Sequence, residues 1–451
     1  MRHTSLLIAL AALAAGGLTT AQAQVTFSGT DKPVWEGTPT RSTGLNQLVV
    51  LHQAQGVSMS FTATGTGPVK WYSYGDRGGG YAEEITSGIT TNGRETTLQQ
   101  VTGDRGYIIE QGTDRYYVWV GDYSQHRLTL TGLAADESAS DCGTTALSVQ
   151  GSGNDFGYYT INGVHQLFDR QLTLAYSTLA WSEESTQWQA VDTTDVSEAF
   201  KSTMVIPAPL CNTTFTLSGD QFEQYWGEGQ SVTSDLYTTH AVDSRCVVTQ
   251  EERDNDNEKG ATDDGTLGGS APAHITFTAY CTDAVVHQEW QEATDQDFNN
   301  IILRLDGTET DQTFTEAGVY YWRFYGSNAD GTCDTYSDTY TVNIGESELV
   351  CPNAFSPGSS EGVNDVWKVS YKSIIEFHCS IFNTWGNRII ELNDPGQGWD
   401  GKYKGKLVDP GVYYYVIRAK GSDGKTYKLS GDINIIRYHK RDLGGGTASG
   451  E

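Results

Sequence analysis

Seven cysteines are the clearest candidates for covalent chemistry in this chain of 451 residues. None forms a C-x-x-C pair and none lies at zinc-ligand spacing from a histidine, so redox catalysis and a zinc site are not expected. In an exported protein these thiols would form disulfides, because the periplasm and the cell surface are oxidising. We predict the pairs Cys281–Cys333 and Cys142–Cys211, and an odd count leaves at least one cysteine unpaired. The other three are Cys246, Cys351 and Cys379.

Three further patterns could support catalysis or metal binding. Residues 358–362 match the G-x-S-x-G elbow of serine hydrolases, but that elbow requires a strand-to-helix turn and a partnered histidine. The nine histidines include no H-E-x-x-H motif. Asp254, Asp256 and Glu258 alternate as calcium ligands do, yet Lys259 stands where the calcium loop needs glycine. We therefore expect no catalytic residue, cofactor or metal, and predict that the chain is not an enzyme.

The N-terminus has the features of a secretory signal peptide. A basic start at Arg2 precedes an apolar run over residues 6–18 and the small-residue triplet Ala21-Gln22-Ala23. We expect cleavage after Ala23. The apolar run is shorter than the roughly 20 residues of a membrane-spanning helix, and no comparable run follows, so no transmembrane segment is predicted.

The distribution of charge divides the remaining chain into two parts. Residues 24–350 carry 15 Lys and Arg against 46 Asp and Glu, whereas residues 351–451 carry 13 against 11. This asymmetry marks the last part as a separate unit. A net negative body also argues against nucleic acid as a partner, because phosphate contacts need a basic surface.

The elements that would position any site are short strands, because alternating runs rich in Thr, Val, Tyr and Phe recur and amphipathic helical periodicity is rare. Apolar residues alternate over 57–63, followed by Trp71 and the aromatic run 116–120. The same order returns over 275–281, Trp290 and 318–322. We interpret this as two copies of one β-sandwich plan with the aromatic residues in the core.

The predicted fold is all-β, a string of immunoglobulin-like or PKD-like sandwiches with a β-sandwich domain at the C-terminus. A middle segment looks rich in strands but has no clear signature, and it alone leaves room for the alternative of an enzyme, which no motif supports. The expected divisions are a signal peptide at 1–23, a sandwich at 24–132, a middle domain at 133–253, an acidic and Gly-rich linker at 254–272, a sandwich at 273–348, a C-terminal domain at 349–437 and a flexible tail at 438–451.

Six phrases in the C-terminal part follow one another in a recognisable order. They lie at 352–357, 362–367, 381–387, 399–406, 410–417 and 430–437. Together they resemble the gliding-motility-associated C-terminal domain, the type B sorting signal of the Bacteroidetes type IX secretion system. The motif residues are Pro352, Asn353, Phe355, Pro357, Asn364, Asp365, Phe382, Asn383, Trp385, Gly386, Trp399, Asp400, Gly401, Gly411, Tyr413, Tyr415, Gly431 and Arg437.

This resemblance implies a function of delivery. Similar domains are recognised by the type IX translocon and its PorP/SprF-type outer-membrane partner barrel after export to the periplasm, and they carry a passenger to the surface or medium. The chain departs from the family where residues 358–361 replace an Asn-Gly-Asp-Gly loop, and in its tail beyond Arg437. We therefore expect a secreted or cell-surface protein, adhesive or structural, with a possible glycan or protein ligand. The alternative is an accessory or signalling component of the secretion and gliding machinery.

Overall fold

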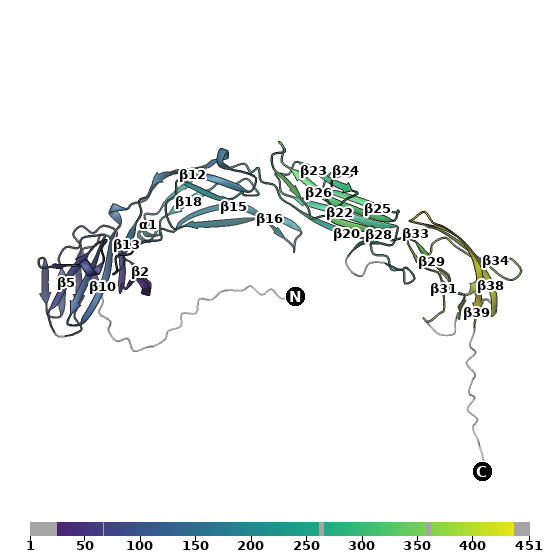
Figure 1. Ribbon diagram of the computed structural model, residues 1–451, viewed down its shortest axis with the longest axis horizontal. Coiled ribbons are helices and arrows are strands. Elements are labelled where there is room, and N and C mark those ends of the chain that lie inside the picture. Colours follow the sequence, from purple (N-terminus) through teal and green to yellow (C-terminus); the bar gives the residue numbers. More distant parts are fainter. Residues whose placement is uncertain (1–24, 66, 261–265, 358–361, 437–451) are drawn as a thin grey trace, which may run out of the picture.

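The computed structural model describes residues 25–65, 67–260, 266–357 and 362–436, which form an arched string of β-domains (Figure 1). The predicted signal peptide with Ala23, the loop at 358–361, Arg437 and the tail lie outside the described residues. Within the described ranges, no helix is long and apolar enough to cross a membrane. The predicted all-β fold is confirmed.

The first sandwich packs a four-stranded sheet against a six-stranded sheet. Val25, Met59 and Phe61 from the first sheet meet Val49 and Trp71 from the second in one buried core, with the alternation that the sequence predicted. The first sheet, in spatial order, is β1 (Val25–Ser28), β4 (Ser58–Thr62), β8 (Glu95–Leu98) and β7 (Ile89–Asn92). The second is β2 (Trp35–Gly37), β3 (Gln47–Leu51), β10 (Asp114–Asp122), β9 (Arg105–Gln111), β5 (Val69–Tyr74) and β6 (Glu83–Ile85).

The third sandwich follows a similar strand order, without counterparts of β2 and β7 and with β27 added. Its smaller sheet orders β20 (Ser244–Gln250), β22 (Ala273–Cys281) and β25 (Glu309–Phe314). Its larger sheet orders β21 (Leu267–Gly269), β28 (Tyr340–Ile344), β26 (Gly318–Ser327), β23 (His287–Ala293) and β24 (Ile301–Asp306), with β27 (Asp334–Tyr336) beside β26. In both sandwiches, the last strand pairs in parallel with an early short strand, β10 with β3 and β28 with β21.

The tryptophans of the two repeated patterns are core residues, but they are not equivalent in position. Trp71, Trp119, Trp290 and Trp322 are at most 1% exposed, which confirms that they fill the interior. Trp119 lies on β10, the last strand of its larger sheet, whereas Trp322 lies on β26, which β27 and β28 follow in the sequence. Similar sequence patterns therefore occur on two strands that are not equivalent, because either strand has inward positions that can hold a large side chain.

The middle segment forms a second sandwich with two short additions. One sheet orders β11 (Thr129–Asp136), β12 (Thr144–Ser152) and β17 (Thr203–Pro207). The other orders β16 (Gln187–Ser197), β15 (Leu172–Ser182), β18 (Thr216–Gly219) and β19 (Gln230–Thr233). The additions are the hairpin of β13 (Gly157–Tyr159) with β14 (His165–Leu167) and the short helix α1 (Gln221–Trp226), whose first turn is capped by the Asp220 side chain.

Strand pairing places two segments in the third sandwich that the sequence divisions assigned elsewhere. β20 completes the smaller sheet of the third sandwich, although residues 244–250 fell within the expected middle domain. β21 pairs with β28, although residues 267–269 fell within the expected linker. Both strands lie at sheet edges, and β21 has only three residues, too few to show the alternation that marks a longer strand.

The C-terminal domain is built on a five-stranded sheet. In spatial order its strands are β30 (Ala354–Phe355), β39 (Thr426–Ile435), β38 (Gly411–Gly421), β33 (Ile374–Phe382) and β34 (Arg388–Leu392). Three small strand pairs accompany it: β29 (Glu348–Val350) with β32 (Ser370–Lys372), β31 (Trp367–Lys368) with β35 (Gly398–Trp399), and β36 (Lys402–Tyr403) with β37 (Lys406–Leu407).

Candidate functional site: the C-terminal domain and the junctions that carry it

The aromatic motif residues of the C-terminal domain form its core. Phe355 and Trp399 are at most 1% exposed, with their ring centroids 5.3 Å apart, and Tyr413 lies 5.2 Å from Trp399. The Nε1 of Trp399 donates to the Lys402 carbonyl at 3.0 Å. Tyr415 packs against Trp367, whose Nε1 donates to the Pro352 carbonyl at 2.7 Å. The buried indoles thus have hydrogen-bond partners and hold the loops before β31 and after β35.

The polar and glycine motif residues shape the turns. The Asn383 side chain accepts hydrogen bonds from the amides of Trp385 (3.1 Å) and Asn387 (2.9 Å), and Gly386 has a φ of 82°. Asp400 accepts from the Lys402 amide at 3.0 Å. Local carboxamide and carboxylate acceptors of this kind close turns.

The remaining motif residues also support the fold. Gly401 and Gly431 lie so close to Pro357 and Tyr415 that an added Cβ would be 2.6 and 2.7 Å from them. Asn353 offers its carbonyl to the Asn434 amide at 2.9 Å, and Asp365 accepts from Gly362 at 2.8 Å. The others are Asn364, at a φ of 57°, Gly411, at the start of β38, and Phe382, at the end of β33.

Trp385 is the exception among the motif residues. It is 83% exposed, the highest value among large hydrophobic residues in the described chain. Sequence reasoning also missed the exposed residues Val412, Tyr414 and Val416 of β38. The alternation along β38 signalled a strand, but the sequence alone did not say which alternate set would face outward.

A loop of the third sandwich joins the C-terminal domain through hydrogen bonds. The Asn257 side chain donates to the carbonyls of Val369 (2.7 Å) and Pro395 (2.8 Å), and the Asn257 backbone carbonyl accepts from the Tyr371 amide at 3.0 Å. The buried Glu258 carboxylate is paired with Arg253 at 2.6 Å. Residues 254–259 of the expected linker are therefore attached to the C-terminal domain.

This loop also accounts for the alternating carboxylates that resembled calcium ligands. Asp256 forms an ion pair with Lys368 at 2.6 Å, in addition to the pair of Glu258 with Arg253. Among the described residues, no three His, Cys, Asp or Glu side chains gather as a metal site requires.

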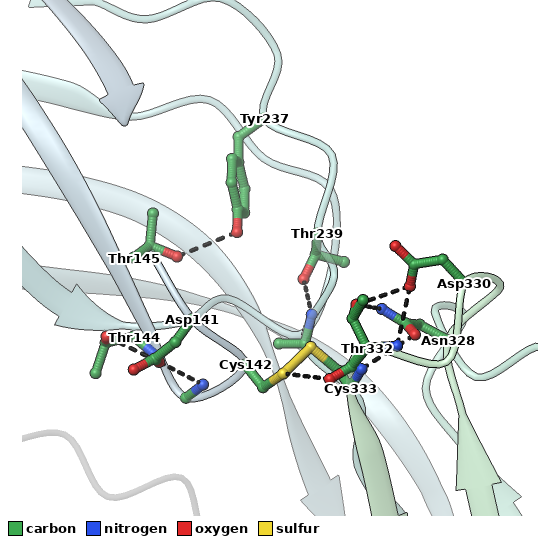
Figure 2. The surroundings of a disulfide bond; sticks show 12 residues. Asp141, Cys142, Thr144, Thr145, Tyr237, Thr239, Asn328, Asp330, Thr332 and Cys333 are labelled. Carbon is green, nitrogen blue, oxygen red and sulfur yellow. Dashed lines mark hydrogen bonds between the residues drawn. A yellow bond between two sulfur atoms is a disulfide. The ribbon is translucent and has the colours of Figure 1, made fainter. Parts of the chain in front are cut away.

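A disulfide links the second sandwich to the third, and neither predicted pairing forms (Figure 2). Cys142, before β12, bonds to Cys333, before β27, across a sequence separation of 191 residues. Cys211 and Cys281 are free thiols. The predictions were wrong because they sought partners within one domain, whereas the two loops come together only when the domains are stacked end to end.

Aromatic contacts accompany the disulfide at this junction. The Nε1 of Trp188 in β16 donates to the Tyr280 carbonyl of β22 at 3.0 Å. Trp181 lies with its ring centroid 5.3 Å from that of Tyr280. The second and third sandwiches are thus held by one covalent bond and by an aromatic contact.

The remaining thiols are poorly suited to catalysis. Burial raises the pKa of Cys246 and Cys379 to about 12 and that of Cys281 to about 11. Burial also raises the pKa of Cys211 and Cys351. Because the thiolate is the nucleophile and the metal ligand, these groups are largely unreactive at neutral pH.

The junction between the first and second sandwiches is a continuous hydrophobic core. Trp119 and Tyr123 of the first sandwich pack with Phe156, Phe222 and Trp226 of the additions to the second. Ring contacts include the Tyr123–Trp226 pair at 5.2 Å and the Tyr123–Phe156 pair at 6.1 Å.

A buried ion pair lies within this junction. Arg170 donates to the Asp220 carboxylate at 2.7 Å, and the two side chains are 3% and 0% exposed. Arg170 also donates to the Asn154 carbonyl at 2.9 Å, while the Tyr123 hydroxyl donates to Asp220 at 3.2 Å. Burial raises the pKa of Asp220, so the surrounding donors are needed to keep its charge.

Two depressions lie on the surface of the third sandwich. One of about 350 Å³ on the third sandwich is lined by Gln250, His274 and Gln312, among other residues. His274 there bonds to the Thr313 hydroxyl at 2.8 Å. The G-x-S-x-G pattern falls almost entirely on residues 358–361, outside the described residues.

Two parts of the chain match known domain families. Residues 349–434 match the CHU_C type IX secretion signal domain, as the resemblance predicted. Residues 134–234 match a fibronectin type III domain. No curated protein is significantly similar in sequence to the chain.

Several solved structures are weakly similar to this chain. The three N-terminal domains of the bacteriophage RB49 outer capsid protein Hoc are 10% identical, with coverage of 69% of this chain and 100% of that chain and a TM-score of 0.22. Fibronectin(III)-like modules of Clostridium thermocellum CbhA are 12% identical, with 42% and 95% covered and a TM-score of 0.18. A Ca²⁺-stabilised adhesin with which an Antarctic bacterium binds ice is 13% identical, with 87% and 96% covered and a TM-score of 0.18. Scores this low carry no argument about function.

Proposed function

Because residues 349–434 are a type IX secretion signal domain, which directs the protein to secretion or cell-surface attachment, we propose that residues 24–348 are a non-enzymatic rod with an adhesive or structural role. One observation carries this proposal: each junction along the chain is fixed. The first is a shared core, the second a disulfide, and the third a hydrogen-bonded loop. Domains fastened end to end hold the first sandwich away from the C-terminal domain (Figure 1).

A ligand would bind to the first sandwich, which lies at the end of the rod away from the C-terminal domain. Its Tyr81 is 63% exposed, and the Arg77 guanidinium lies 3.8 Å from the centre of the Tyr81 ring. An exposed aromatic ring with a stacked cation is suited to contact a surface glycan or a protein. The matched fibronectin type III domain, a kind typical of non-enzymatic proteins, also disfavours an enzyme in the middle segment.

The partners proposed for export are the type IX translocon and its PorP/SprF-type outer-membrane barrel. The test is fractionation of cells that produce either the full chain or a form ending at residue 348. The full chain is expected at the surface or in the medium, and the shortened form in the periplasm. Equal distributions of the two forms would refute delivery by the C-terminal domain.

The adhesive role is tested separately with the purified passenger, residues 24–348. Binding to glycan arrays or host-surface proteins, weakened at least fivefold by Tyr81→Ala, is the expected result. Glu83→Ala, an exposed substitution nearby, is the control. A passenger that binds no polymer or surface protein would leave only a structural role.

A second candidate is an accessory component of the secretion and gliding machinery. The attachment of the C-terminal domain by Asn257 and Lys368 favours it, because a domain held to its passenger is suited to remain there. Deletion of the gene would then impair the export of other proteins as well. Normal export of those proteins would leave the rod as the better account.

A further inference from the structure

On the outward side of β38 in the C-terminal domain, the residues of the first half are apolar and those of the second half are basic. Along β38, Tyr413, Tyr415 and Ile417 pack against the core. The alternate residues Val412, Tyr414 and Val416 point outward and are 37%, 46% and 45% exposed. The next outward residues are Arg418 and Lys420. Outward positions of an antiparallel sheet are normally polar, so the first half of β38 departs from the rule that its second half obeys.

The neighbouring strand and turn extend this apolar area. β38 lies between β33 and β39 in the sheet, and Phe382 of β33 stands directly opposite Tyr414. The turn that follows Phe382 carries Trp385, which is 83% exposed. We call Phe382, Trp385, Val412, Tyr414 and Val416 the outer apolar patch. Single exposed apolar residues are common on proteins, but a contiguous group of them marks an interaction site.

A row of basic residues borders the outer apolar patch. Arg418 stands directly opposite Lys428 of β39. On its other side is His378 of β33, whose ring lies 3.6 Å from the Glu391 carboxylate. Like charges opposite each other across strands are unfavourable. Within the described ranges, neither Arg418 nor Lys428 forms an ion pair, whereas Lys420 is paired with Glu376 at 3.7 Å. Carboxylates supplied by another molecule would stabilise these basic residues by forming ion pairs with them.

The smaller sheet of the third sandwich shows the usual polar pattern on its outward face. On β22, the inward residues Ile275 and Phe277 alternate with the outward Thr276 and Thr278. Thr276 donates to Asp311 of the neighbouring strand at 2.6 Å. Threonine at such positions suits a strand as well as valine does and leaves no apolar surface in water. The valines of β38 are therefore not required for the strand to form.

We propose that the outer apolar patch and its basic border form the docking face for a protein of the type IX outer-membrane apparatus. That protein would present an apolar surface flanked by carboxylates. The proposal rests on the proposed delivery function and makes it more specific. It distinguishes the residues that stabilise the signal domain from those that bind its partner. The buried motif residues stabilise the fold of the domain. The partner protein would contact Trp385, Tyr414, Val416, Arg418 and Lys428.

The test compares full-length variants in cells by protease accessibility at the surface. Tyr414→Ser with Val416→Ser removes the apolar centre, and Arg418→Glu with Lys428→Glu reverses the basic border. Each pair is expected to lower the surface fraction at least tenfold, with accumulation in the periplasm. Val205→Ser, at an exposed strand position of the second sandwich, is the matched control and should be delivered normally. Thermal unfolding of each purified variant confirms that the domain remains folded, as expected for surface substitutions.

The outcomes separate this proposal from the delivery function. If the form ending at residue 348 stays in the periplasm but both folded double variants reach the surface normally, delivery stands and the docking face is overturned. If the truncated form also reaches the surface, delivery itself fails. A benzophenone amino acid at position 385 that cross-links to lipid, or to a second copy of the chain, would likewise overturn docking on a protein of the apparatus.

Discussion

The first and last junctions of this chain are held together by different forces. Between the first and second sandwiches, aromatic residues such as Tyr123, Phe156 and Trp226 form a dry core around the Arg170–Asp220 pair. Between the third sandwich and the C-terminal domain, hydrogen bonds from the Asn257 side chain and between Ser270 and Ser373 join the two domains, and Ile375 packs at the edge of the third core. A dry core ties the folding of two domains together, whereas water can replace much of a polar junction. The N-terminal pair is therefore one unit, and the signal domain is an attached module.

The disulfide between Cys142 and Cys333 belongs to neither kind. It fixes the middle junction beside the half-buried rings of Trp181 and Trp188. The three junctions thus run from a buried core, through a covalent link, to a polar loop along the chain.

Removal of the buried carboxylate should have the largest effect. Asp220→Ala leaves Arg170 buried without its counter-ion and removes the cap of α1. We expect the first two sandwiches to lose about 3–5 kcal/mol of stability. Hydrogen exchange read peptide by peptide should show faster exchange in residues 25–233 and no change in residues 349–436. Asp114→Ala, at an exposed site in the first sandwich, is the control.

Faster exchange in the signal domain of the Asp220→Ala variant would contradict the comparison. It would mean that the polar junction transmits unfolding as well as the dry core does.

Removal of the disulfide should have an intermediate effect. Cys142→Ser is expected to lower the stability of the joined second and third sandwiches by about 2–4 kcal/mol. It should also widen the distribution of angles between them, measured by small-angle X-ray scattering. Cys211→Ser, which changes a free thiol, should leave the scattering curve unchanged. An unchanged curve for Cys142→Ser would show that the contacts of Trp181 and Trp188 suffice to fix the junction.

Weakening of the polar junction should have the smallest effect. Asn257→Ala removes two hydrogen bonds to the carbonyls of Val369 and Pro395, which water can then reach. We expect a loss of about 1 kcal/mol, because water replaces most of what is lost. Limited proteolysis should cut the loop at 253–259 several times faster, with Asn92→Ala as the exposed control. A loss of stability as large as that expected for Asp220→Ala would contradict the conclusion that the last junction is weaker than the first.

The sequence determined the local structure of this protein. Alternation over 57–63 and 275–281 identified β4 and β22, and Trp71 and Trp290 were identified as core residues. The six phrases of the C-terminal domain identified the secretion signal, because turns and buried aromatics need particular residues at particular spacings. These features depend on neighbours in the chain, which a sequence displays directly.

Only the tertiary structure decided what lies between distant segments. The partner of Cys142 is 191 residues away, and the loop around Asn257 meets Tyr371 of another domain. Which alternate set of β38 faces outward, and hence the exposure of Tyr414 and Val416, depends on the register of β38 with β33 and β39. Strand alternation is symmetric with respect to the two faces of a sheet, and end-to-end stacking of domains leaves no periodic trace in the sequence. For these reasons the elements could be predicted, and the junctions and the docking face could not.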